Sequence, residues 1–224
     1  MSRHALFNLR PAHSYFRALI ACERFFCASK LEILIVLVRV SASISVAACG
    51  QDSVSNAPVT KIQLTVPDLT VVNQSGEKVR FNSDVIENRV AVVTSFFTSC
   101  TAFCPLTEER LSRLAKDLGD RMGKDVVFVS VSVDPKRDTS QKMKAWGEKF
   151  HIGQGWTLVS GQKEDVETLL KSFGLYVDMQ RHQSALIIGN QRQGWVRVSS
   201  WASPAKLAQV IDGIEKNPPL TAGK

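Results

Sequence analysis

From residue 61 onward, apolar and polar positions follow a pattern that predicts alternating strands and helices. Two unbroken apolar runs, 90–97 and 125–133, are typical of parallel strands that are covered on both faces. A short strand is expected at 156–159, and the segments 184–188 and 195–198 read as an antiparallel hairpin. Four segments with helical spacing or start signals are predicted to be helices: 106–118, 140–150, 163–173 and 204–215.

The segment before the first buried run also alternates. Residues 61–72 alternate apolar and polar side chains, 73–76 supply a turn, and 78–81 alternate again, so we expect an N-terminal β-hairpin at one edge of the sheet. The whole order predicts an α/β fold, a thioredoxin-like mixed sheet with flanking helices and an N-terminal β-hairpin.

The N-terminal segment has the pattern of an export signal. Residues 31–48 are the most apolar stretch, but Glu32 and Arg39 interrupt it, so it is too short and too charged for a good membrane-spanning helix. The stretch 46–50 resembles a bacterial lipoprotein box in which Cys49 is lipidated. An ordinary signal peptide and a mitochondrial presequence are the alternatives.

These patterns divide the chain into four parts. We expect a signal or lipoprotein leader at 1–49, a flexible tether at 50–60, a thioredoxin-like domain at 61–217 and a tail at 218–224. The expected location is the bacterial cell envelope, with the domain outside the cytoplasm and held at the membrane by the N-terminal lipid. The alternative location is the mitochondrial inner membrane.

Charge argues against one class of partner. The net charge of +7 falls to +3 after Cys49, because residues 1–49 hold six of the 28 basic and two of the 21 acidic residues, which leaves 22 against 19. No Lys/Arg block interleaved with aromatic residues follows, so nucleic-acid binding is not expected.

Cysteine positions point to a single dithiol site. Of five cysteines, only Cys100 and Cys104 belong to the body of the chain, and they lie where a strand turns into a helix, next to Pro105. The helix amides and dipole should favour the thiolate form, which attacks disulfides or binds soft metals. The spacing is wrong for a C-x2-C thioredoxin, and Phe97 stands where a peroxiredoxin needs threonine.

Four motifs resemble the Sco/SenC family, and the resemblance covers about residues 62–214. They are 97–105, 131–139, 155–158 and the histidine in 176–184. That resemblance implies a copper-binding thioredoxin fold, tethered outside the cytosol, that helps to assemble the dinuclear copper centre of cytochrome c oxidase or reduces its cysteines. The likeness departs from the family pattern at Thr101, where proline is common, and in the approach to the histidine.

Matching the family pattern, Cys100, Cys104 and His182 would be the copper ligands. The chemistry agrees, because residues i and i+4 lie on one helical face and soft sulfur together with imidazole suits copper. Zinc is a weaker interpretation, since a structural zinc site wants four ligands.

Other candidate residues receive structural interpretations. His151 is expected to be structural at a helix end and Met179 to be a packing or exposed residue rather than a ligand. Asp134 could support the site from behind, whereas capping of a helix is the simpler role for Asp138 or Thr139.

Three functions remain open. The first is a membrane-tethered copper metallochaperone that hands copper to an oxidase subunit. The second is an extracytoplasmic thiol-disulfide oxidoreductase whose redox dithiol is Cys100 and Cys104, with Cys100 at the exposed turn as the attacking residue and a disulfide-bearing partner protein. The third is a copper-dependent redox sensor without chemistry of its own, so the chain need not be a conventional enzyme.

Overall fold

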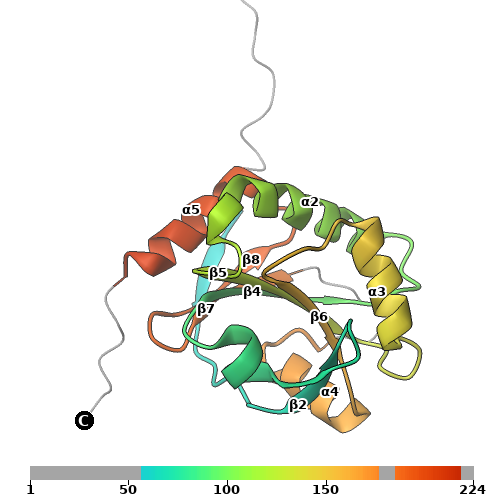
Figure 1. The fold of residues 1–224 in the computed structure, drawn as a ribbon. Coiled ribbons are helices and arrows are strands. Elements are labelled where there is room, and N and C mark those ends of the chain that lie inside the picture. Colours follow the sequence, from blue (N-terminus) through green and yellow to red (C-terminus); the bar gives the residue numbers. More distant parts are fainter. Residues whose placement is uncertain (1–56, 177–184, 218–224) are drawn as a thin grey trace, which may run out of the picture. The chain divides into compact units, whose positions relative to one another are not determined.

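The computed structural model describes residues 57–176 and 185–217, and Figure 1 shows their arrangement. Strand β4 (Val90–Phe96) lies in the middle of the sheet and is parallel to β5 (Val126–Ser132), which is parallel to β6 (Trp156–Ser160). Every residue of β4 and β5 except the half-buried Ser95 is buried, as the unbroken apolar runs predict. The described strands form one eight-stranded sheet, in the order β1-β8-β7-β4-β5-β6-β2-β3.

Antiparallel strands complete both sides of this parallel centre. On one side, β7 (Ala185–Asn190) pairs with β4 and β8 (Gly194–Ser199) pairs with β7, which confirms the predicted C-terminal hairpin. On the other side, β2 (Thr70–Asn73) pairs with both β6 and β3 (Lys78–Arg80). The N-terminal hairpin is therefore present at one edge.

The segment that leads into this hairpin differs from its prediction. Residues 61 and 62 belong to β1 (Val59–Ile62), which pairs with β8 at the opposite edge of the sheet. Pro67 lacks an amide donor for a strand ladder. The next residue, Asp68, accepts hydrogen bonds from the backbone amides of Asn82 and Ser83 instead. The alternating pattern of residues 61–72 thus spans the end of β1, the connection that crosses to the opposite edge of the sheet, and the start of β2.

Helices cover both faces of the sheet (Figure 1). Helix α2 (Phe103–Leu118) and helix α5 (Pro204–Glu215) pack on one face in a single apolar cluster. Helix α3 (Ser140–Lys149) continues that layer over β4 and β6. The opposite face is covered by α4 (Lys163–Ser172) and the π-helix η1 (Phe81–Ile86), and a 3-10 turn, η2 (Gly119–Arg121), follows α2.

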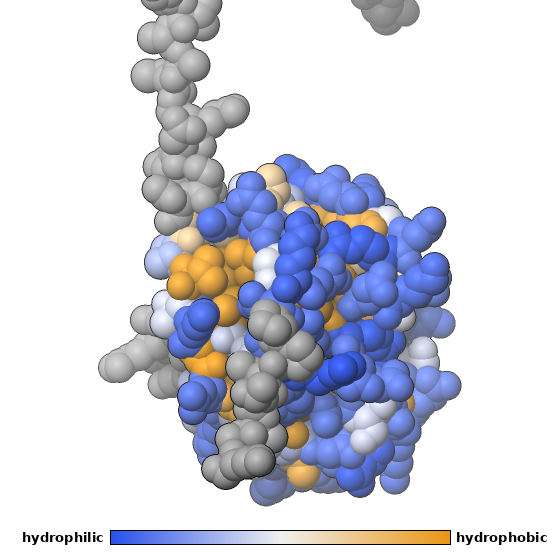
Figure 2. Space-filling model, turned by 90° about the vertical axis from the view of Figure 1, so that its left-hand side faces the viewer, coloured by the Kyte–Doolittle hydropathy of each residue, from blue (hydrophilic) through white to orange (hydrophobic). Residues whose placement is uncertain are grey.

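This arrangement confirms the predicted α/β class and mixed sheet with flanking helices. The four predicted helices are present, although α2 begins at Phe103, three residues before the predicted start. The face drawn in Figure 2 is mostly hydrophilic and carries smaller hydrophobic patches. Within 57–176 and 185–217, no helix is both long and apolar enough to cross a lipid bilayer.

Candidate metal and dithiol site

Cys100 lies on the six-residue loop between β4 and α2, and Cys104 lies in the first turn of α2. Strand β4 ends at Phe96, and α2 begins at Phe103 after the cap residue Ala102, whose side chain makes no capping hydrogen bond. Cys104 is therefore the second helical residue. Pro105 is the third rather than the first, but it is still in the first turn, where its missing N–H leaves no helical hydrogen bond unmade.

Both cysteine residues are free thiols and are only 8 % exposed. The backbone amide of Cys104 donates a hydrogen bond to Sγ of Cys100 at 3.4 Å, so the first sulfur lies over the start of the helix. The amide of Cys100 in turn donates to the carbonyl of Phe97 at 3.0 Å. The loop thereby brings the Cys100 sulfur onto the backbone of Cys104.

Burial overrides the expected effect of the helix dipole on Cys104. The two cysteines pack in an apolar cluster with Phe96, Met143 and Trp146. This desolvation, followed by the hydrogen bond and charge interaction with Cys100, raises the pKa of the Cys104 thiol far above its usual range. The prediction of a thiolate-favouring helix end is therefore wrong for Cys104 in the metal-free chain.

The prediction that Cys100 stands exposed at its turn is also wrong. Thr101, Ala102 and Phe103 are exposed, whereas the Cys100 side chain is turned inward. Neither sulfur is therefore openly accessible at the surface of the loop.

Glu108 is a buried carboxyl that sequence reasoning missed. It lies one turn after Cys104 on the inward face of α2 and is 1 % exposed. Ser130 Oγ donates to its Oε2 at 3.4 Å, while Oε1 has no hydrogen-bond partner among the described residues. Burial raises its pKa to about 8. The sequence did carry a signal for this burial. Glu108 is four residues after Cys104 and three before Leu111, so helical spacing places its carboxyl on the apolar face of the helix.

Asp138 holds the dithiol loop from behind. Its Oδ1 accepts hydrogen bonds from the amide and hydroxyl of Thr98, at 3.1 and 2.6 Å, and its Oδ2 accepts one from Ser132 Oγ at 2.6 Å. It is 2 % exposed and is not the cap of α3, since Thr139 fills that role by accepting from the amide of Lys142. Asp138 thus ties the residue two before Cys100 to the end of β5.

Whereas Asp138 binds the dithiol loop, the carboxylate of Asp134 pairs with Arg137. His151 follows the end of α3 with φ 55° and donates its amide to Glu148, in agreement with a structural role.

The remaining predicted site residues lie outside the described residues: His182, Met179 and Cys49. Within the described ranges, no three His, Cys, Asp or Glu side chains gather closely enough to hold a metal ion. Among the described residues, the candidate copper ligands are therefore the two thiols of Cys100 and Cys104.

Sheet topology nevertheless relates the dithiol to the start of β7. Because β7 is antiparallel to β4, with Val93 opposite Ile187, its first residue Ala185 lies at the sheet end where β4 runs into the dithiol loop. The chain therefore enters β7 at the dithiol end of the sheet.

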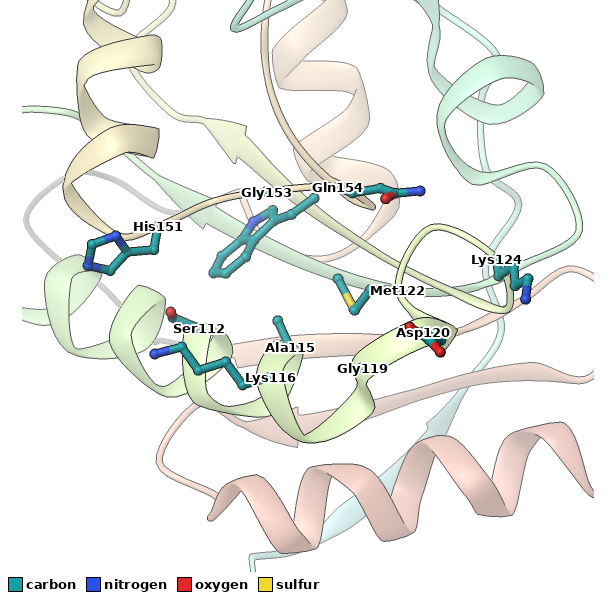
Figure 3. A pocket seen from close by; sticks show the side chains of 11 residues that line it. Ser112, Ala115, Lys116, Gly119, Asp120, Met122, Lys124, His151, Gly153 and Gln154 are labelled. Atoms are coloured by element: carbon teal, nitrogen blue, oxygen red, sulfur yellow. The ribbon is translucent and has the colours of Figure 1, made fainter.

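A surface pocket of about 450 Å³ lies away from the dithiol (Figure 3). It is lined by the second half of α2, the turn after it and the start of β6, including Lys116, Met122, His151 and Trp156. The dithiol lies at the other end of the parallel strands, so this pocket is separate from the candidate site.

Comparison with known proteins gives a consistent match. The family model described as SCO1/SenC matches residues 59–201. The SCO1 protein homolog of Bacillus subtilis is 28 % identical over 150 residues, which cover 63 % of this chain and 74 % of that protein. The chain spans about half the length of most of the curated relatives it matches.

Solved structures share the fold. A SCO1/SenC family lipoprotein from Bacillus anthracis superposes with a TM-score of 0.58 at 24 % identity, over 70 % of this chain and 96 % of that one. Arabidopsis thaliana ScoI with copper bound superposes with a TM-score of 0.55 at 20 % identity, over 66 % of this chain and 96 % of that one. These likenesses confirm the predicted fold.

Proposed function

Because the chain belongs to the SCO1/SenC family, we propose that it is a membrane-tethered copper metallochaperone for the copper centre of cytochrome c oxidase. Copper is its cargo, bound by Cys100, Cys104 and His182 and passed to an oxidase subunit by ligand exchange. The observation that carries the proposal is the contact between the two cysteines, whose sulfurs are soft copper ligands: the Cys104 amide donates to Cys100 Sγ at 3.4 Å, and the two thiols interact with each other.

The dithiol needs a further ligand, and topology supports His182. This residue precedes Ala185 by three positions, and β7 begins at the dithiol end of the sheet. Three residues reach at most about 10 Å, and this short connection supports His182 as the candidate third ligand. An imidazole added to two thiolates suits copper.

The raised pKa of Cys104 fits a site that metal completes. Cu(I) binds thiolates, so loading must displace the thiol protons and makes apparent affinity depend on pH. The apolar cluster around the sulfurs then keeps water away from the metal.

Location follows as a separate proposal. Cys49 is the proposed lipidated residue, residues 50–60 the tether and 1–49 the leader, with the domain held outside the cytoplasm. The relative from Bacillus anthracis is a lipoprotein, which supports an anchor of this kind. The mass of the mature N-terminal peptide tests it, and a product that begins elsewhere without lipid would exclude Cys49.

A second function is favoured by the interaction between the two thiols. Attack by one Cys thiolate on a partner disulfide forms a mixed disulfide and releases one partner thiolate. The other cysteine then attacks the mixed disulfide, which closes a Cys100–Cys104 disulfide and releases the second partner thiol. Two electrons pass to the partner, so the chain must afterwards be reduced again.

Copper titration of the full-length chain separates the two functions. We expect one copper per wild-type chain, no stable binding by Cys100→Ser or Cys104→Ser, and weaker binding by His182→Ala. His151→Ala is the matched control and should bind as wild type does. Full binding by His182→Ala would remove it from the ligand set, whereas a wild type that reduces disulfides but binds no copper would favour the oxidoreductase.

A further inference from the structure

An exposed apolar surface adjoins the dithiol. Five large apolar side chains in the described ranges are more than two-fifths exposed, and three of them are Phe103, Leu106 and Trp201. The rings of Phe103 and Trp201 meet edge to face with centroids 5.9 Å apart. Leu106 follows Phe103 by three positions on α2, so it shares that helix face.

Arg110 completes this surface and lacks an acidic partner there. Its guanidinium lies 4.6 Å from the centre of the Trp201 ring, and one N–H donates to the Leu106 carbonyl at 3.2 Å. No carboxylate among the described residues pairs with it, whereas Arg113 on the next turn pairs with Glu109 at 2.6 Å. Because a guanidinium carries five N–H donors, Arg110 can still receive a carboxylate.

We call Phe103, Leu106, Arg110 and Trp201 the α2 patch. It is continuous with the dithiol loop, since Phe103 lies between Cys100 and Cys104 in the sequence. The sulfurs are buried while Phe103 is 42 % exposed. A protein that approaches the sulfurs from the Phe103 side of the loop meets the patch.

We propose that the α2 patch is the docking surface for the oxidase subunit that accepts copper, which places an apolar side chain against Phe103, Leu106 and Trp201 and a carboxylate on Arg110. Stacking on Trp201 already orders the Arg110 side chain, so less entropy is lost on binding. Tryptophan and arginine are also the residue types that most often dominate binding energy at interfaces. This inference rests on the proposed function, because it concerns the partner of the same dithiol.

The test uses the full-length copper-loaded chain and the reduced, metal-free copper domain of cytochrome c oxidase as the probe. Two quantities are measured: the dissociation constant of the pair and the rate of copper transfer. We expect Arg110→Glu and Trp201→Ala each to weaken association and slow transfer by about tenfold. Added salt should slow wild-type transfer, because it screens the attraction between Arg110 and the partner carboxylate, and should speed transfer by Arg110→Glu, because it screens the repulsion there.

Lys78→Glu is the matched charge reversal, because Lys78 is exposed on β3 at the far edge of the sheet. It should transfer copper as wild type does. All variants should bind copper with wild-type stoichiometry, which shows that they fold. If the wild type binds no copper, the proposed function fails, whatever the docking result.

Two outcomes would overturn the docking proposal while leaving copper binding intact. One is association and transfer by Arg110→Glu within about twofold of wild type. The other is that the patch binds lipid instead. A Trp201 emission shift with phosphatidylcholine–phosphatidylglycerol vesicles, together with no change in transfer for Trp201→Ala, would assign the patch to the membrane surface.

Discussion

A single carboxyl on α2 sets a pH dependence for the whole chain. Glu108 is almost fully buried, one helical turn from Cys104, and one of its oxygens has no hydrogen-bond partner among the described residues. Burial raises its pKa from an ordinary value of 4.5 to about 8. Over most of that interval the folded chain keeps a proton that the unfolded chain has lost.

We therefore expect the free energy of unfolding to fall as pH rises from about 5 to about 8, because the unfolded state binds fewer protons in that window. Glu108→Gln should remove this part of the pH dependence, which is on the order of 4 kcal/mol. Denaturant unfolding of the reduced, metal-free chain across this range measures it. Glu109→Gln, which changes an exposed carboxylate on the same helix, is the control, and equal slopes for wild type and Glu108→Gln would contradict the expectation.

At the scale of elements, the loop between β4 and α2 depends on a contact with the loop after β5. Asp138 accepts three hydrogen bonds, two from Thr98 and one from Ser132. The site is thus positioned by a residue forty positions away from Thr98. Neither strand alone fixes the dithiol.

Asp138→Asn should loosen the loop, because an amide cannot accept at both of its polar atoms. We expect a loss of about 2 kcal/mol in stability and a roughly tenfold loss in copper affinity. Glu109→Gln is the control, since Glu109 and its partner Arg113 both have exposed side chains and such pairs contribute about 1 kcal/mol or less. Competition titration against a Cu(I) chelator measures affinity, and equal losses for both variants would argue against a special role for Asp138.

The elements themselves were largely predictable because each has a local signal. Buried strands show as unbroken apolar runs, and Thr139 and Ser203 precede α3 and α5 as capping residues. The crossing from β1 to β2 was not predictable, because alternation says nothing about which edge a strand joins. The π-helix η1 also had no recognised pattern.

The candidate site was predictable only in part, because only some of its features have a local signal in the sequence. The four-residue spacing of the cysteines is local and places Cys100 against Cys104. The burial of both sulfurs, the position of Glu108 and the contact of Asp138 with Thr98 depend on tertiary packing. The pKa expectation for Cys104 was wrong because burial outweighs the helix end.

At the scale of the whole molecule, copper and folding are linked. Metal that binds the folded chain and not the unfolded one stabilises it, by about 2.7 kcal/mol when free metal exceeds the dissociation constant a hundredfold. For a domain of this size that corresponds to a rise in Tm of roughly 5–10 °C. Any affinity of the unfolded cysteines for copper reduces the rise.

We expect Cu(I) to raise the Tm of the full-length chain, with a smaller rise in His182→Ala and none in Cys100→Ser. Differential scanning calorimetry under reducing conditions, with buffered Cu(I), measures these shifts. Silver(I), a soft ion that does not change oxidation state under these conditions, should act similarly. A rise of the same size in Cys100→Ser would place the metal elsewhere on the chain.

The separation of β1 from β2 has a consequence for the order in which the sheet is built. These strands are neighbours in sequence, yet β2 pairs with β6, and β1 pairs with β8, where Val59 stands opposite Val198. A chain that is made and delivered N-terminal end first presents β1 before any strand that can pair with it. Its edge of the sheet closes only after residues 194–199 have followed, so the first strand to emerge is among the last to fold.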